Sequence, residues 1–231
     1  RRMAVELESR VGWGCISKQV TGKGGVTLLR EMPDEANEGT VIGRVVRESL
    51  GYKLCTADVG LKLEDFTVIA TTAGAQMGII AGADTGWGSF EDMIAAGKAG
   101  QDIRFGVMSQ RLGELAYLLG KAQGVDFNII SVRGGRAVLN GVTAGDMDVG
   151  FMAGIQRPGV AAGDLTILAS AMSKPLDQDP DAPLIADLGV DFDGDAIFMF
   201  AGPGGMPAEA RDAIATAISE AASDPETEVG A

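Results

Sequence analysis

The sequence predicts an α/β protein in which short buried strands alternate with amphipathic helices. The clearest evidence lies between Ile103 and Met152, which reads as strand, helix, strand, helix and strand. A second observation is the presence of 34 glycines, which suit a chain with many strand-to-helix junctions. A third is the 46% hydrophobic content, which can form a packed core and argues against disorder. The length of 231 residues allows one large domain or two small ones.

The first helix of this central region has recognisable signals at both ends. An apolar strand is predicted at 103–107, and Ser109 follows it as an N-cap whose hydroxyl can accept from free backbone amides. Gly124 suits the left-handed residue that commonly ends a helix. The positions i, i+3, i+4 and i+7 between these signals form an apolar stripe: Leu112, Leu115, Ala116 and Leu119.

A second strand-to-helix turn follows the first. We expect a buried strand at 127–132, a helix at 137–143 opened by the glycines 134–135, and a third strand at 147–152. The two turns would then direct their backbone amides toward the carboxyl edge of a parallel sheet. Open α/β sheets bind ligands at this edge, and helix N-termini favour anions.

Further elements are predicted on both sides of this region. Strands are expected at 15–20, 40–46, 67–70, 165–169 and 196–201. Helices are expected at 1–11, 26–32 and 89–97, with a short helical piece at 185–189. The helix at 89–97 would begin with a capping box between Ser89 and Asp92. A last helix is expected from its apolar face: Ala210, Ile214, Ile218 and Ala221. The pattern predicts two α/β lobes with a ligand cleft between them. Lobe one would comprise 1–80 and 191–231, and lobe two 81–190.

The charge of the chain limits its partners. The net charge is −13 and the isoelectric point is near 4.4, which disfavours nucleic acid and anionic membrane surfaces. No apolar run approaches the roughly 18 residues of a membrane span, so we expect no direct membrane insertion. If the ligand is an anion, local dipoles and a few basic side chains must attract it.

The sequence contains no histidine, which removes histidine triads, the common zinc sites and histidine general bases. Cys15 and Cys55 could form one disulfide, or could be two unpaired buried thiols. No nucleophile, base and orienting group come together in the sequence. We therefore predict a binding protein without catalytic residues, metal or cofactor.

Several residues are candidates for ligand binding. The glycine turn 21–25 lacks the spacing of a phosphate loop, and it reads either as a turn exposing amides to a small ligand or as a tight turn only. Ser109 is either a cap that also faces the ligand or a cap alone. Arg111 and Arg136 lie in the first turns of helices, where a bound anion would offset their unfavourable position; otherwise they are solvated surface arginines. Thr71 could donate its hydroxyl into the cleft.

The order and spacing of several motifs resemble one family. The motifs are TGKGG (21–25), DFTVIA (65–70), SFEDMIAAGKAG (89–100), FGVMS (105–109), VRGGRAVLNGVTAGDMDVG (132–150), GDLTILASAMSKPLDQDPDAPLIADLG (163–189) and AGPGGMPAEARDAI (201–214). Together they resemble the periplasmic solute receptors of tripartite tricarboxylate transporters, the Bug-type receptors.

This resemblance implies a type II periplasmic binding protein fold that closes on a small mono-, di- or tricarboxylate. It implies a periplasmic monomer that passes its ligand to membrane transporter subunits. Matching the family's ligand loops to this sequence implies contacts through five residues: Gly24, Gly25, Ser109, Gln110 and Gly135.

The chain also departs from the family pattern. The family's first strand and ligand loop should precede Arg1, its final helices should follow about Pro225, and the segment 108–115 (MSQRLGEL) lacks the usual histidine. Two rival hypotheses remain beside the receptor. One is a ligand-sensing regulatory domain of the same two-lobed fold, and the other is an enzyme on a two-lobed scaffold.

Overall fold

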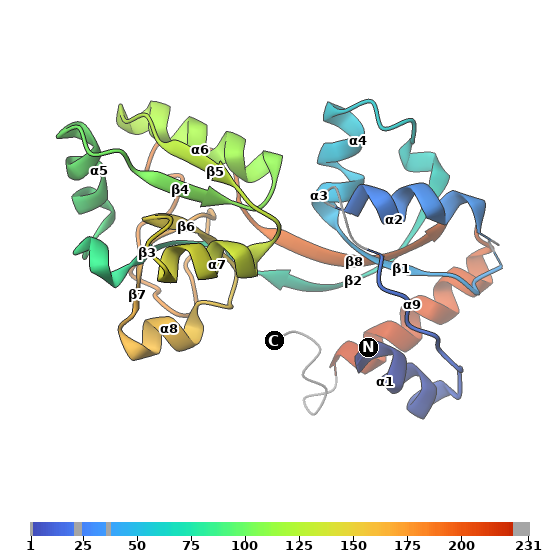
Figure 1. Ribbon diagram of the computed structural model, residues 1–231. Helices are drawn as coiled ribbons and strands as arrows, with labels where there is room; N and C mark the ends of the chain where they lie inside the picture. The colour runs from blue at the N-terminus through green and yellow to red at the C-terminus, as the bar shows by residue number, and fades with distance from the viewer. Residues whose placement is uncertain (1, 21–24, 36–37, 224–231) are drawn as a thin grey trace. The chain divides into compact units, whose positions relative to one another are not determined.

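The computed structural model describes residues 2–20, 25–35 and 38–223 (Figure 1). The chain forms two compact units: unit 1 comprises Arg1–Gly74 and Ile197–Ala231, and unit 2 comprises Ala75–Ala196. The sequence predicts lobe boundaries after residues 80 and 190. The first observed boundary follows Gly74, six residues earlier than predicted, and the second follows Ala196, six residues later. The reason is that two long strands, one ending at Ala75 and one beginning at Ala196, mark the two passages between the units.

Unit 1 is built around a three-stranded sheet with the order β1-β8-β2. Its strands are β1 (Gly43–Val46), β8 (Ala196–Pro203) and β2 (Phe66–Ala75). The pairing of β1 with β8 is antiparallel and places Gly43 opposite Ala201. Because successive side chains of a strand face opposite sides, Met199 and Phe200 belong to two different hydrophobic clusters.

Helices cover the two faces of this sheet. They are α1 (Arg2–Val11), α2 (Val26–Glu31), α3 (Arg47–Leu50), α4 (Tyr52–Thr56) and α9 (Ala208–Ser223), with 3₁₀ turns η2 (Met32–Asp34) and η3 (Leu63–Asp65). In one cluster, Leu7 of α1 and Ile218 of α9 pack with Phe200. In the other, Leu29 of α2 packs with Met199. Unit 1 therefore has a helical layer on each side of the sheet.

Some predictions for unit 1 are wrong. The strand expected at 15–20 is absent: this segment has no regular structure, and Ile16 is fully exposed. The residue types of this segment are not sufficient for a strand, because no strand within the described residues pairs with it. The strand expected at 40–46 begins only at Gly43, and the short helices α3 and α4 were not predicted.

Unit 2 is built around a five-stranded sheet with the order β5-β4-β6-β3-β7. Its strands are β5 (Asn128–Ser131), β4 (Arg104–Val107), β6 (Val149–Met152), β3 (Gly78–Gly82) and β7 (Leu165–Ser170). β4 is parallel to β5 and β6, as predicted, whereas β3 is antiparallel to both β6 and β7. The sheet is therefore mixed rather than parallel. β5 lies at its edge and is half exposed, which corrects the expectation of a buried strand.

Helices also cover both faces of this second sheet (Figure 1). They are α5 (Phe90–Lys98), α6 (Gln110–Gln123), α7 (Gly135–Thr143) and α8 (Arg157–Ala162), with the 3₁₀ turn η4 (Ala83–Thr85). Ile79 packs in the cluster that includes α5 and α6, and Ile80 packs in the cluster that includes α7. The helix α8 was not predicted. The residues 185–189 form turns rather than the expected short helix.

Two glycines allow α7 to pack close to the sheet. Gly106 of β4 and Gly150 of β6 are paired across the ladder. A Cβ atom added to Gly150 would lie 2.4 Å from Cγ1 of Val138 in α7, which is too close for any side chain. The absence of side chains at these positions thus fixes the height of α7 above the strands. Within the described part of the chain, no helix has the length and apolar character needed to span a membrane.

Candidate functional site

The carboxyl ends of β4, β5 and β6 meet at one edge of unit 2. The parallel register pairs Val107 with Ser131, and the amide of Val132 donates to the carbonyl of Val107 over 2.9 Å. A Cβ atom built on Gly135 would lie 3.5 Å from Sδ of Met108 and 3.4 Å from Cδ1 of Ile155. The turns after all three strands are therefore neighbours. This confirms the prediction that two strand-to-helix turns share an edge, and it adds a third.

The start of α6 is capped as the sequence predicts. The hydroxyl of Ser109 accepts a hydrogen bond from the amide of Leu112 over 3.3 Å. The side chain of Gln110 is exposed and donates to Oε1 of Glu114 over 3.2 Å. The cap role of Ser109 is confirmed, whereas contact of Ser109 and Gln110 with a ligand stays a prediction.

The start of α7 has no side-chain cap. Its N-cap, Gly134, adopts φ 82° and ψ 163°, a conformation that favours glycine. The carbonyl of Gly134 accepts a hydrogen bond from the amide of Ala137 over 3.1 Å. Gly135 and Arg136 come before this bond and are the first two residues of the helix. The first amides of a helix have no partner within it. The beginning of α7 can therefore offer backbone N–H groups to an anion, beside the exposed side chain of Arg136.

Arg111 has a different role from either of the two considered in the sequence. Its guanidinium donates to the carbonyl oxygens of Asp193 and Asp195 and lies 3.4 Å from Oδ1 of Asp195. It also lies 4.8 Å from the centre of the Phe192 ring. The side chain is 11% exposed, so Arg111 is neither a solvated arginine nor open to a ligand. The sequence did not reveal this because its partners are more than 80 residues away.

The three turns at this edge carry positive charge only. The segments 108–111, 132–136 and 153–157 contain four arginines and no aspartate or glutamate, although the whole chain has a charge of −13. Arg111 is occupied by its own contacts. The other three arginines are exposed and have no ion-pair partner among the described residues: Arg133, Arg136 and Arg157. Arg133 and Arg157 were missed in the sequence, where basic turns free of acidic residues would have been the signal.

Gln156 is a second feature that the sequence did not reveal. It is 2% exposed, and its Nε2 donates to Oε1 of Gln178 over 2.8 Å. Its own Oε1 is buried and has no hydrogen-bond partner among the described residues. Gln156 links the turn after β6 to the loop after β7 and leaves one amide oxygen unsatisfied.

The candidate residues of unit 1 are placed less fully. Gly24 lies outside the described residues. Gly25 is the N-cap of α2 with φ 92°, and a Cβ atom there would lie 2.6 Å from Oγ of Ser49, so glycine is needed for the turn itself. Thr71 is exposed in β2, and the neighbouring Thr72 hydroxyl donates to the carbonyl of Phe198 over 3.4 Å. A role of Gly25 and Thr71 in ligand binding stays a prediction.

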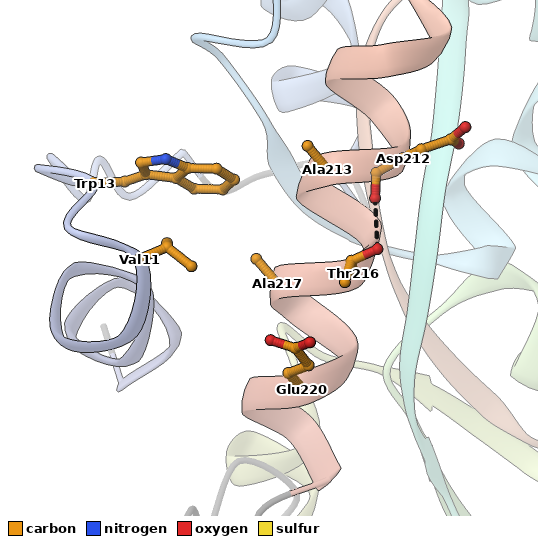
Figure 2. A pocket seen from close by; sticks show the side chains of 7 residues that line it. All are labelled: Val11, Trp13, Asp212, Ala213, Thr216, Ala217 and Glu220. Carbon is orange, nitrogen blue, oxygen red and sulfur yellow. Dashed lines mark hydrogen bonds between the residues drawn. The ribbon is translucent and has the colours of Figure 1, made fainter.

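A cavity of about 360 Å³ lies elsewhere in unit 1, against α9 (Figure 2). Figure 2 shows Val11 and Trp13 facing α9 on the side of Ala213 and Ala217. Its remaining lining residues are Asp212, Thr216 and Glu220. Among the residues that the structure describes, two carboxylates and no cationic side chain line this cavity, so its chemistry does not suit an organic anion.

Cysteine and metal chemistry contribute nothing further to the site. Cys15 and Cys55 are both free and exposed, which corrects the expectation of either a disulfide or buried thiols. Within the described residues, no group of three or more cysteine, aspartate or glutamate side chains is arranged to hold a metal ion.

Solved proteins, among them a periplasmic binding protein, share this fold. MatC from Rhodopseudomonas palustris with bound malate is 16% identical with a TM-score of 0.82, covering 98% of this chain and 79% of that chain. A second R. palustris protein, solved with adipate, is 18% identical with a TM-score of 0.83, covering 98% and 78%. The periplasmic binding protein BugD is 17% identical with a TM-score of 0.83, covering 98% and 78%. This confirms the predicted two-lobed α/β fold.

The family follows from the sequence match. Residues 1–229 match the Tripartite tricarboxylate transporter family receptor, and the chain belongs to this family. The resemblance drawn from the motifs is therefore confirmed, and the family consists of receptors rather than enzymes. No curated protein matches the sequence closely enough to count as a relative.

Proposed function

We propose that this chain is an extracytoplasmic solute-binding receptor that captures a small organic carboxylate and delivers it to a tripartite tricarboxylate-type transporter. Membership of the receptor family supports the transport role. The carboxylate is supported by two proteins of the same fold, one solved with malate and one with adipate.

The observation that carries the proposal is the charge of one edge of unit 2. Three neighbouring turns without acidic residues bring helix beginnings together, and two of these turns carry exposed arginines that have no ion-pair partner in the part of the chain that the structure describes. Amides at a helix N-terminus carry partial positive charge, and arginine binds a carboxylate through two parallel hydrogen bonds. A carboxylate at this edge would find local attraction in a molecule that is acidic as a whole.

At this edge the proposed ligand contacts are the backbone of Ser109 and Gln110, the amide of Gly135, and both the amide and the guanidinium of Arg136. The exposed position of Arg136 and the uncapped start of α7 support this choice. The proposal includes a periplasmic location, action as a monomer, and transfer of the ligand to the membrane subunits of the transporter. The family description supports the transporter partner.

A thermal-shift screen tests the proposal. The purified chain is heated with acetate, succinate, malate, adipate and citrate, and with succinamide as an uncharged counterpart of succinate. A ligand present at about 100 times its dissociation constant should stabilise the native state by about 2.7 kcal/mol. We expect at least one carboxylate to raise the melting temperature and succinamide to have no effect. Failure of every carboxylate to do so would contradict the proposal.

A further inference from the structure

The strongest unexplained feature of unit 2 is the burial of Arg111. This residue lies in the first turn of α6, directly after Ser109 and Gln110. Its partners lie in residues 190–195, which we call the connecting segment because the chain passes from it into β8 and unit 1. A single side chain thus joins the start of α6 to the last part of unit 2.

The contacts of Arg111 with the connecting segment are specific. Nη1 donates to the carbonyl of Asp195 over 3.0 Å, and Nη2 donates to the carbonyl of Asp193. Nη2 also lies 3.4 Å from the carboxylate of Asp195, and the guanidinium stacks on the Phe192 ring. A buried cation is costly unless its hydrogen-bond donors are satisfied, so these contacts favour one conformation of the segment.

The connecting segment is also held from its other side. The carboxylate of Asp193 accepts hydrogen bonds from the amide and, over 3.0 Å, from the hydroxyl of Ser173. The amide of Gly194 donates to the carbonyl of Ala171 over 2.7 Å. A Cβ atom on Gly194 would lie 2.9 Å from that same oxygen, so the two backbones are in close contact. The segment therefore lies between α6 and the turn after β7, with polar contacts to both.

We propose that Arg111 is a positioning residue that couples anion binding at the start of α6 to the conformation of the connecting segment. This inference rests on the proposed function, because it needs an anion at that helix start. A ligand bound to the first turn of α6 acts on the same turn that carries Arg111. Coupling of this kind is reciprocal, so the conformation of the segment also changes the affinity for the ligand.

Hydrogen exchange measured by mass spectrometry tests the coupling in the full chain. Malate is the first probe and adipate the second, each at about 100 times its dissociation constant. In the unsubstituted protein, the bound probe should slow exchange in peptides covering 190–197 by about threefold or more. In Arg111→Met, these peptides should exchange about tenfold faster without ligand, and the probe should no longer slow them.

Two further variants separate coupling from simple loss of stability. Arg111→Lys keeps the charge but loses the planar guanidinium, so it should retain part of the ligand-dependent protection. The same variant replaces Arg111→Met in the test if Arg111→Met does not fold. Asp193→Asn weakens the link to Ser173 but leaves the backbone carbonyl that Arg111 uses. It should therefore keep the ligand-dependent protection.

Two results would overturn the inference while leaving the proposed function intact. One is a probe that raises the melting temperature but does not change exchange at 190–197. The other is ligand-dependent protection of the same size in Arg111→Met. If neither malate nor adipate nor any other carboxylate of the thermal-shift panel binds, the proposed function itself fails, and the coupling fails with it.

Discussion

At the scale of single residues, the account depends on cations that have no acidic partner within the described ranges of the chain. Arg136 is the most informative of them, because it adjoins the uncapped start of α7 and is exposed. Arg104 shows the contrast: its hydrogen bonds to Asp148 raise the pKa of its guanidinium, and that pair lies at the opposite ends of the strands, where β4 and β6 begin. Unit 2 therefore contains two kinds of arginine. Structural arginines such as Arg104 bind other groups of the protein, and available arginines such as Arg136 are exposed and can bind a ligand.

Replacement of Arg136 tests the available group. Arg136→Gln should weaken binding of the best carboxylate by about tenfold or more, because a charge-assisted contact is lost. The unfolding midpoint should change little, since Arg136 has no partner among the described residues. Titration calorimetry measures the affinity, and Lys98→Gln, at the end of α5, is the matched control that should bind normally. If Arg136→Gln bound the carboxylate as tightly as Lys98→Gln does, Arg136 would not be part of the binding site.

Replacement of Asp148 tests the structural group. Its carboxylate binds Nη2 of Arg104 over 2.6 Å and the backbone amide of Arg104 over 2.8 Å. Asp148→Asn should lower the midpoint of urea unfolding, because the charged acceptor between β4 and β6 is lost. Asp146→Asn is the control, since the hydrogen bond from Arg104 to Asp146 goes to the backbone carbonyl and the Asp146 side chain adds only a weaker charge interaction. A decrease of the same size in both variants would show that the ion pair is not the cause.

At the scale of elements, the sequence predicted what local hydrogen bonds determine. The capping box of Ser89 and Asp92, the cap at Ser109 and the left-handed Gly124 were all found where expected, because their partners lie within four residues. The mixed sheet and the helix α8 were not predicted. Strand direction depends on partners far along the chain, and α8 is too short for its pattern to be visible.

The same division applies to the candidate site. The turns after β4 and β5 could be predicted, because each contains a local strand-to-helix signal. The burial of Arg111 and the position of Gln156 could not, because each depends on a loop that comes much later in the sequence. Tertiary contacts decide which polar residues are available to a ligand.

The helix α6 contains two glycines that should respond oppositely to alanine. At Gly113 the nearest atom to an added Cβ is 3.7 Å away, so Gly113→Ala should stabilise by about 0.5–1 kcal/mol through helix propensity. At Gly120 an added Cβ would lie 2.5 Å from the carbonyl oxygen of Val125, so Gly120→Ala should destabilise by about 1–3 kcal/mol. Urea unfolding measures both. Destabilisation by Gly113→Ala would contradict the packing described for this helix.

At the scale of the whole molecule, unit 2 is continuous in sequence, whereas unit 1 is formed from two separate segments. Among the described residues, the two hydrophobic clusters of unit 2 contain none from unit 1. A fragment comprising residues 75–196 should therefore fold on its own. Circular dichroism and a dispersed amide spectrum would show this, and the spectrum of an unfolded chain would contradict it.

The central claim is that an organic anion binds at the carboxyl edge of β4, β5 and β6. The most direct measurement is an amide ¹H–¹⁵N chemical-shift titration of the full chain with malate and with adipate. We expect the largest changes at the amides of 109–112 and 134–137. Binding that leaves these amides unchanged and shifts those around the α9 cavity, at 212–220, would contradict the claim.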